Sequence, residues 1–331
     1  MKGKGMPGSC GVEKRLGGKG MGNHRYLVIA RVGDGSLHRE WLQPAEHKNF
    51  DLCLSYYGNE PGRYANECDY YVESKGPKFI KLHELIQSLG SLVFQYDAIW
   101  LPDDDISTNA YNISRMFQIF SEQNLQLAQP ALTKHAFFQV TVRHIDYKLR
   151  YTKFVEVMVP IFSREALQIC WPTFNKSLTG WGLEHVWAKL LGYPNKKMAI
   201  IDETPVKHTR PAGGGELYRN IEAEYGINVW QNTENLLNEY GIVAPPPHEI
   251  TFYGGIKLWN PIGAKRAPAK KVRGRRSKRR GRPLRRKGSA GRKRRLYRPG
   301  RAISRRSGLK FGGRGKAAAR SKRMNTKFKA A

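Results

Sequence analysis

Residues 96–110 read YDAIWLPDDDISTNA, and this stretch decides the fold class. An apolar run from Tyr96 to Leu101 stops at Pro102 and three aspartates, and Ser107, Thr108 and Asn109 then offer helix caps before Ala110. A strand, a turn and a helix in this order are typical of one unit of an α/β fold. Open α/β sheets bind ligands at the carboxyl ends of their strands, so the three carboxylates stand where a ligand is expected.

The same alternation continues on both sides of this stretch. Apolar runs predict strands over residues 26–30, 50–57, 154–162 and 197–202, and helical spacing predicts helices over residues 37–46, 78–89, 164–169 and 183–191. Strands that alternate with helices favour an α/β fold with a mixed, mainly parallel sheet.

The charge is distributed unevenly along the chain. Its 331 residues hold 58 Lys and Arg against 27 Asp and Glu, but residues 265–331 contribute 30 of these bases and no acid. The remaining residues are therefore close to neutral, which excludes a uniformly basic nucleic-acid-binding domain. We expect a flexible Gly- and Lys-rich arm over residues 1–25, one domain over residues 26–260 and a disordered Lys- and Arg-rich tail over residues 261–331.

Other patterns exclude further classes of protein. No stretch approaches the ~20 apolar residues of a membrane span, and residues 1–23 lack the apolar region of a secretory signal. We therefore expect a cytoplasmic protein without a transmembrane segment; the basic tail leaves a nuclear location, or a peripheral one on an anionic membrane, as alternatives. The four cysteines show no C-x-x-C spacing, which predicts reduced thiols and no zinc site.

The acidic triplet predicts a metal site. Asp103 and Asp105 are two residues apart and face the same way in an extended chain, and paired carboxylates suit Mg²⁺ or Mn²⁺. His208 follows a predicted strand and could complete the ligand set. The alternatives are a solvated acidic turn in which Asp105 helps to cap the next helix, and a His208 that is an ordinary surface or hydrogen-bonded residue.

The sequence TGWGLE at residues 179–184 is the third feature. Gly180 and Gly182 allow close backbone approach, Trp181 offers a flat apolar platform for a sugar, and Glu184 could act as a general base. The alternative is that Glu184 only stabilises the first turn of the helix predicted over residues 183–191, where the helix dipole favours an acid.

Three segments together resemble a known family: IWLPDDDI at residues 99–106, TGWGLEHVW at residues 179–187 and VKHTRPAGG at residues 206–214. They are similar to an uncharacterised "domain of unknown function" family of plants and bacteria, whose members resemble GT-A nucleotide-sugar glycosyltransferases. Plant members of that family often carry a label related to lysine-ketoglutarate-reductase trans-splicing. The resemblance covers residues 26–219.

The resemblance implies a GT-A-like, Rossmann-like domain that transfers a sugar from a UDP- or GDP-sugar to a hydroxyl of a glycan or other acceptor, with inversion. It implies a D-x-D metal motif at Asp103 and Asp105, a metal-binding His208, and an acceptor and base motif similar to that of inverting galactosyltransferases. The last motif comprises Gly180, Trp181, Gly182 and Glu184, although a single glutamate followed by His185 replaces a run of acids. The implied donor-binding residues are Arg31, Gly33, Asp34 and Asp104.

Two other functions remain open. Asp103, Asp105 and Ser107 also resemble the nucleophile motif of haloacid-dehalogenase-like phosphatases, which need a second acidic cluster after a later strand, here ending at Asp202 and Glu203.

The tail offers the other function. Its segment Arg280-Gly281-Arg282-Pro283 is similar to the AT-hook core that binds the DNA minor groove. A tract this basic binds polyanions, so DNA, RNA and anionic surfaces are possible partners.

Overall fold

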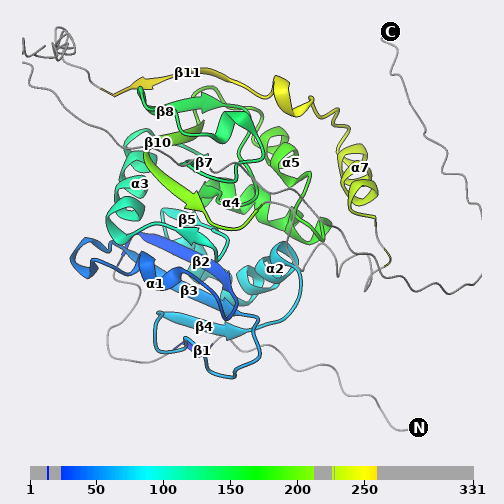
Figure 1. Ribbon diagram of the computed structural model, residues 1–331. Coiled ribbons are helices and arrows are strands. Elements are labelled where there is room, and N and C mark those ends of the chain that lie inside the picture. Colours follow the sequence, from blue (N-terminus) through cyan, green and yellow to red (C-terminus); the bar gives the residue numbers. More distant parts are fainter. Residues whose placement is uncertain (1–12, 15–23, 212–225, 227, 259–331) are drawn as a thin grey trace, which may run out of the picture. The chain divides into compact units, whose positions relative to one another are not determined.

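The computed structural model describes residues 13–14, 24–211, 226 and 228–258 (Figure 1). The predicted tail, with Arg280, Arg282 and Pro283, lies outside these residues. The described strands form one sheet in the order β1-β4-β3-β2-β5-β9-β7-β10-β8-β11, with β6 paired to β10.

The first half of the sheet is parallel. Strands β2 (Tyr26–Val32) and β3 (Phe50–Tyr56) pair in parallel over seven residues each. They are flanked by β4 (Tyr70–Glu73) and β5 (Ala98–Trp100), which are also parallel to them, while β1 (Glu13–Lys14) pairs with β4 in the opposite sense.

The second half of the sheet is mixed. Strand β9 (Ile161–Ser163) runs antiparallel between β5 and β7 (Leu127–Leu132), and β10 (Met198–His208) is parallel to β7. Strand β8 (Tyr147–Thr152) lies antiparallel between β10 and β11 (Phe252–Lys257). Within the described chain seven of the eleven strands, β2, β3, β4, β5, β7, β10 and β11, therefore point the same way, which confirms the predicted α/β fold with a mixed, mainly parallel sheet.

Six α-helices accompany the strands in the described residues. They are α1 (His38–Trp41), α2 (Lys78–Leu89), α3 (Ala110–Glu122), α4 (Arg164–Cys170), α5 (Leu183–Leu190) and α7 (Val229–Glu239). Short 3₁₀ turns lie at Ala45–His47, Gly90–Gln95, Gln139–Thr141, Trp171–Lys176 and Pro247–Glu249. No helix of the described residues is long and apolar enough to cross a membrane.

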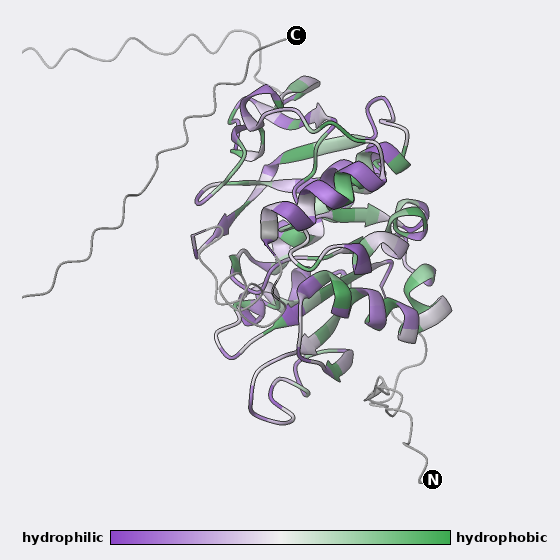
Figure 2. Cartoon of the chain, turned by 90° about the vertical axis from the view of Figure 1, so that its right-hand side faces the viewer, coloured by the Kyte–Doolittle hydropathy of each residue, from purple (hydrophilic) through white to green (hydrophobic). Residues whose placement is uncertain are grey.

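Helices cover both faces of the sheet because successive strand residues point to opposite faces. Val28 of β2 shares a buried cluster with Ile113 and Phe117 of α3. Its neighbours Leu27 and Ile29 belong to a second cluster, which includes buried residues of α2, α4 and α5. Many of the helices accordingly show both hydrophilic and hydrophobic residues in Figure 2.

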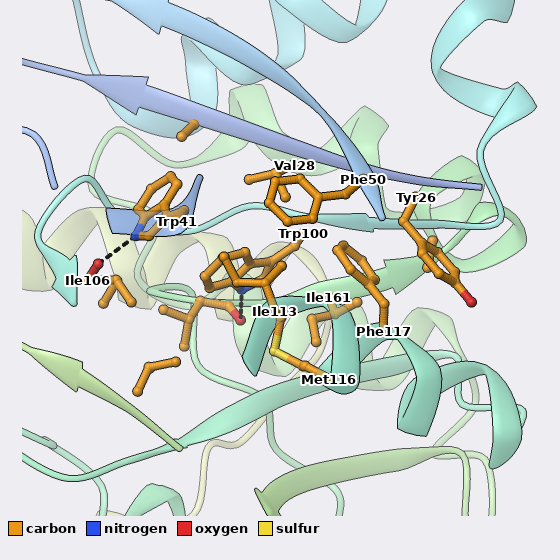
Figure 3. Packing of buried hydrophobic residues seen from close by; sticks show 14 of the residues in the cluster. Tyr26, Val28, Trp41, Phe50, Trp100, Ile106, Ile113, Met116, Phe117 and Ile161 are labelled. Atoms are coloured by element: carbon orange, nitrogen blue, oxygen red, sulfur yellow. Dashed lines mark hydrogen bonds between the residues drawn. The ribbon is translucent and has the colours of Figure 1, made fainter. Parts of the chain in front are cut away.

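Two buried tryptophans fix the chain around the acidic triplet (Figure 3). The Trp41 indole donates a hydrogen bond to the carbonyl of Ile106 (2.7 Å), and the Trp100 indole donates to that of Val159 (3.1 Å). Both side chains have no exposed surface. They therefore hold the segments before and after the triplet against the same core.

Two predicted elements differ from the structure. The strand predicted over residues 154–162 is wrong for most of its length, because only β9 at Ile161–Ser163 pairs in the sheet. The helix predicted over residues 37–46 is interrupted at Pro44, which leaves the one-turn α1 and a 3₁₀ turn.

Candidate active site

The three aspartates follow β5 and are brought to the end of β10 by a short strand. That strand, β6 (Ile106–Ser107), begins directly after Asp105 and pairs antiparallel with Lys207 and His208 at the end of β10. Backbone pairing thus places Asp105 beside His208 although about a hundred residues separate them in sequence.

Asp103, Asp105 and His208 form a group that could hold a metal ion. Each residue offers one ligand atom, and the three atoms lie within 4.8 Å of one another. The Oδ2 of Asp105 lies 3.2 Å from Nε2 of His208, and both side chains are buried. Carboxylate oxygens and an imidazole nitrogen are a donor set that fits Mn²⁺ or Mg²⁺. The structure therefore brings the predicted ligand residues together.

Charges within this group shift the proton equilibria of Asp105 and His208. Burial opposes charge on the imidazole, but the hydrogen bond and the negative charge of Asp105 outweigh burial and raise the pKa of His208. Burial likewise opposes charge on Asp105, yet His208 and the backbone N–H of Arg210 lower its pKa. Both shifts favour the ion pair of Asp105 and His208, so a cation that binds through the imidazole competes with the proton of His208.

Asp103 is paired with Lys78 of α2. The Lys78 ammonium lies 2.6 Å from Oδ1 of Asp103 and also donates to the carbonyls of Leu101, Val157 and Met158. Burial, together with the neighbouring aspartates, nevertheless raises the pKa of Asp103, because these effects outweigh the charge of Lys78. A cation beside Asp103 and Asp105 would relieve this repulsion.

Asp104 does not belong to the group of Asp103, Asp105 and His208, which we call the metal-type group. Its Oδ2 accepts hydrogen bonds from the backbone N–H of Gly33 (2.8 Å) and the hydroxyl of Tyr57 (2.9 Å), and its Oδ1 lies 3.3 Å from the Arg210 guanidinium. The predicted donor-binding residues Gly33 and Asp104 are thus in contact, but Asp104 is buried and its oxygens are engaged within the protein.

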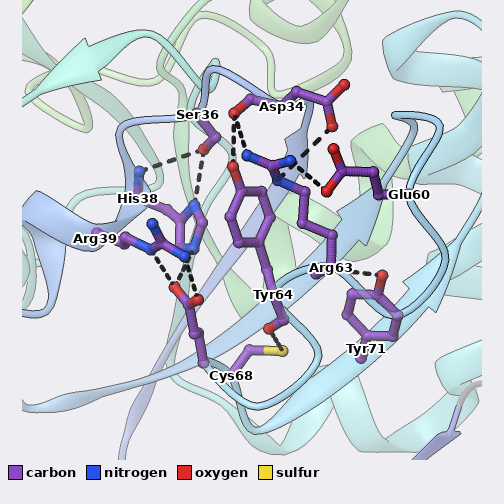
Figure 4. Close-up of polar contacts among 10 residues, drawn as sticks. Asp34, Ser36, His38, Arg39, Glu60, Arg63, Tyr64, Cys68 and Tyr71 are labelled. Carbon is purple, nitrogen blue, oxygen red and sulfur yellow. Dashed lines mark hydrogen bonds and ion pairs between the residues drawn. The ribbon is translucent and has the colours of Figure 1, made fainter.

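The turn after β2 is held by Tyr56 at the end of β3 and by Tyr64 of the β3–β4 connection; Figure 4 shows Tyr64 beside Asp34. The hydroxyl of Tyr64 donates to the carbonyl of Asp34 (2.7 Å), and the Asp34 carboxylate accepts a hydrogen bond from Tyr56. Asp34, one of the predicted donor-binding residues, is exposed beside Gly33. Arg31, in contrast, is buried, and its guanidinium donates to Ser55 and to the carbonyls of Ser74 and Gly76, so its side chain is engaged within the fold.

The TGWG loop leads into α5 through two glycines with positive φ. Gly180 has φ 87° and Gly182 has φ 91°, a conformation that other residues adopt only with strain. A Cβ on Gly180 would lie 2.6 Å from the Phe79 ring, so this loop packs directly on α2. These glycines are needed for the backbone itself, besides any close approach of an acceptor.

Trp181 belongs to an aromatic surface that the sequence did not reveal. Its ring centroid lies 5.1 Å from that of Trp230 and 6.5 Å from that of Phe137. Trp230 is 67% exposed and Phe137 55% exposed. We call Phe137, Trp181 and Trp230 the aromatic surface; it is assembled from the β7–β8 connection, the TGWG loop and α7.

Glu184 is buried at the start of α5, and one of its carboxylate oxygens, Oε2, has no hydrogen-bond partner among the described residues. Burial raises its pKa to about 7, and backbone N–H groups of the turn oppose this shift only in part. Desolvation of the carboxyl therefore outweighs the helix dipole, which favours the ionised form of an acid in the first turn. A carboxyl with this pKa suits proton transfer near neutral pH.

The sequence did not reveal a second buried glutamate, Glu156, which interacts electrostatically with Glu184, His208 and Asp103. It is 5% exposed in the connection between β8 and β9, and burial raises its pKa to about 8. The negative charges of Glu184 and Asp103 raise this pKa further, whereas His208 lowers it. The signal that could have found it is a glutamate within the otherwise apolar run FVEVMVP at residues 154–160. Lys78 and Arg210 were missed as well, because their pairing with the aspartates depends on tertiary contacts.

The phosphatase alternative needs a second acidic cluster that the described chain does not supply at the expected place. Asp202 is buried, and both of its oxygens accept from the Arg150 guanidinium at 2.9 Å. Strand β10 continues past Asp202 to His208 instead of ending there. Asp202 therefore serves an internal ion pair.

Residues 89–234 match the family model described as "Protein of unknown function (DUF707)". No curated protein matches the chain. Among solved structures, S. aureus TarS matches with a TM-score of 0.39 and 12% identity over 65% of this chain; the chain spans only 42% of that protein.

Residues 1–349 of S. aureus TarS in complex with UDP-GlcNAc match with a TM-score of 0.40 and 11% identity, over 65% of this chain and 71% of that one. The complex with UDP gives the same values. The matched residues 89–234 include all three segments that carry the sequence resemblance, at residues 99–106, 179–187 and 206–214. The predicted resemblance is thereby confirmed: over residues 89–234 this chain matches the uncharacterised family of proteins of unknown function DUF707.

Proposed function

We propose that this protein is a glycosyltransferase of the GT-A type, which moves a sugar from a nucleotide-diphosphate donor to an acceptor hydroxyl. The observation that carries the proposal is the convergence of Asp103, Asp105 and His208 within 4.8 Å at the carboxyl end of β5. In an α/β sheet this end of the strands is where ligands bind.

The donor diphosphate is proposed to bind over this group. Asp103, Asp105 and His208 would hold Mn²⁺ or Mg²⁺, and such a cation stabilises the negative charge of a leaving diphosphate. Arg210, whose guanidinium is half exposed at the same edge, adds a positive charge for the phosphates. The UDP or GDP part would extend towards the turn at Gly33 and Asp34, which lies against the triplet through Asp104.

The acceptor is proposed to bind on the other side, against the aromatic surface. Sugar rings pack their apolar faces on exposed aromatic side chains, and Trp181 and Trp230 offer such faces beside the loop that leads to Glu184. A glycan or another hydroxyl compound is the acceptor class that fits.

The proposed reaction proceeds with inversion. The acceptor oxygen forms a bond to the anomeric carbon while the bond between that carbon and the diphosphate oxygen breaks, and the diphosphate leaves with the electron pair. The acceptor proton moves to the carboxylate of Glu184. The unpartnered Oε2 of Glu184 supports this role, because a buried acceptor of hydrogen bonds lacks a donor until the acceptor hydroxyl arrives.

Thermal unfolding of the full chain tests the proposal. We expect UDP or GDP to raise the melting temperature in the presence of Mn²⁺ and to lose this effect in EDTA, because ligands that bind only the folded state stabilise it. Asp105→Ala should abolish the metal-dependent shift, whereas Asp146→Ala, at an exposed aspartate 65% accessible on its side chain, should keep it. A nucleotide shift of equal size in Asp105→Ala would contradict the metal assignment.

A further inference from the structure

Glu156 is a buried acid whose bonding is left incomplete by the described part of the chain. Its backbone N–H donates to the amide oxygen of Gln129 at 2.6 Å, which fixes the connection between β8 and β9. The side chain is 5% exposed, and its Oε2 has no hydrogen-bond partner among the described residues. A buried polar atom without a partner lowers stability, and a catalytic or binding role is one reason why a fold keeps such an atom.

Glu156 interacts with charged groups on both sides of the proposed reaction, the metal-type group on the donor side and Glu184 on the acceptor side. The charges of Asp103 and His208 act on its carboxyl from the metal-type group, and that of Glu184 acts on it from the start of α5. The hydroxyl of Thr141 also hydrogen-bonds to the carboxyl. With its pKa raised to about 8 by burial, Glu156 carries a proton at neutral pH and can donate as well as accept a hydrogen bond.

The chemistry of glycosyl transfer defines what must occupy the space between these groups. The transferred sugar is bonded to the diphosphate on one side and is attacked by the acceptor oxygen on the other. Asp103 and His208 belong to the diphosphate side of the proposed site, and Glu184 to the acceptor side. Glu156 interacts electrostatically with both sides, and its buried Oε2 lacks a partner among the described residues, so its carboxyl is available to a sugar that lies between them.

We propose that Glu156 binds the transferred sugar, its unpartnered oxygen forming a hydrogen bond with a sugar hydroxyl of the donor, and so selects the donor sugar. This inference rests on the proposed function. Glu156 takes no proton from the acceptor in this assignment, because that step belongs to Glu184. A buried group made to hydrogen-bond a substrate hydroxyl discriminates strongly against a ligand that lacks it.

Calorimetric titration of the full chain in Mn²⁺ tests the assignment. The probes are UDP and GDP alone and three sugar nucleotides of each base: glucose, galactose and N-acetylglucosamine for UDP; glucose, mannose and fucose for GDP. In Glu156→Leu we expect the affinity for the free nucleotide to stay within twofold of wild type. The affinity for the sugar nucleotide that wild type prefers should fall at least tenfold, while Glu156→Gln, which keeps a donor and an acceptor, should restore most of it.

The melting temperature separates a binding role from a structural one. Glu156→Leu removes a buried carboxyl with an unpartnered oxygen, so its melting temperature should rise or stay unchanged while sugar-nucleotide binding is lost. A lower melting temperature with equal loss of nucleotide and sugar nucleotide would overturn the inference. Glu156→Asp gives the same comparison if the leucine variant does not fold, because the shorter side chain withdraws the oxygen from the sugar.

The outcomes distinguish this inference from the proposed function. Equal sugar-nucleotide binding by Glu156→Leu and wild type, with nucleotide binding intact in both, overturns the role of Glu156 alone. A wild type that binds no nucleotide and no sugar nucleotide overturns the proposed function and this inference with it. The exposed Glu165 of α4 supplies the control: Glu165→Gln should bind every probe as wild type does.

Discussion

Each aspartate of the triplet is bound by a different partner. Asp103 pairs with Lys78, Asp105 with His208, and Asp104 accepts from the backbone of Gly33. Because these partners come from α2, β10 and the turn after β2, three adjacent residues connect three separate parts of the fold. Their substitutions should therefore have different consequences for stability and for binding.

Asp104→Ala should be more destabilising than Asp105→Ala. It would remove the acceptor shared by Gly33 and Tyr57, and the buried N–H of Gly33 left without an acceptor should cost about 1–3 kcal/mol. Asp105→Ala should cost less, because His208 can release its proton when its partner is removed. Urea unfolding of the two variants in EDTA measures the difference; a smaller loss in Asp104→Ala than in Asp105→Ala would contradict it.

Glu184→Gln should reduce sugar transfer about 10²- to 10⁴-fold, because the amide cannot take the acceptor proton. Its melting temperature should be equal to or above that of wild type, since a buried carboxyl with an unpartnered oxygen is removed. In wild type the rate should rise with pH through about 7, as Glu184 loses its proton. An unchanged rate in Glu184→Gln would show that Glu184 has a structural role and does not act as the base.

At the scale of elements, the TGWG loop shows how packing restricts the sequence. The loop passes over Phe79 of α2 with so little space that Gly180 admits no Cβ, and it then delivers Trp181 and Glu184 on either side of Gly182. The aromatic surface and the proposed base are therefore positioned by one short segment, whose geometry depends on α2.

Gly180→Ala should destabilise the protein more than Gly192→Ala. Both positions have positive φ, which costs an alanine about 1 kcal/mol, but only at position 180 would the Cβ collide with another side chain, at 2.6 Å from Phe79. The collision should add about 1–3 kcal/mol. Urea unfolding of both variants measures this difference. Equal losses in the free energy of unfolding would show that the loop moves to accommodate the Cβ without strain.

At the scale of the whole molecule, the buried glutamates connect stability to pH. The pKa of Glu156 is raised from 4.5 to about 8, so the folded protein binds this proton more tightly than the unfolded chain does. Below pH about 4.5 the carboxyl is protonated in both states, and the stability associated with this protonated form is fully present. As the pH rises from about 4.5 to 8 only the folded state keeps the proton, so this stability is lost progressively.

The free energy of unfolding should thus fall between pH 5 and 8, with a slope from this group of up to about 1.4 kcal/mol per pH unit. Glu156→Gln should flatten the profile of the full chain in EDTA, because the amide does not titrate. The matched variant Glu165→Gln changes an exposed acid and should leave the profile as it is. A profile of Glu156→Gln that is as steep as that of wild type would contradict the assignment.

The tail should make polyanion binding strongly dependent on salt. With 30 bases and no acid over residues 265–331, the full chain should lose at least ~10³-fold in DNA affinity between 50 and 200 mM salt. If Arg280, Arg282 and Pro283 act as an AT-hook, Arg280→Ala with Arg282→Ala should remove a preference for A·T-rich duplexes and change the salt slope only slightly. Fluorescence anisotropy with A·T-rich and G·C-rich duplexes tests both expectations.

Periodicity and capping predicted the regular elements best. The helix predicted over residues 78–89 coincides with α2, and Asn109, one of the predicted caps, accepts from the N–H of Asn112 at the start of α3. Residues 154–160 were predicted as a strand because they are apolar, but they form no strand, and the backbone N–H of Glu156 donates to the side chain of Gln129 instead. An apolar composition indicates that a segment such as residues 154–160 is buried, but a buried segment need not pair in a sheet.

By itself the sequence determined the α/β class, the helices with strong periodicity and the residue types of the metal-type group, because these depend on local spacing and on chemistry carried by single side chains. Only the tertiary structure decided which charges meet. Pairing of β6 with β10 brings His208 to Asp105, α2 brings Lys78 to Asp103, and the β8–β9 connection brings Glu156 near Glu184. The physical reason is that pKa values and ligand geometry depend on distances of a few ångströms and on burial, which arise when distant segments pack together.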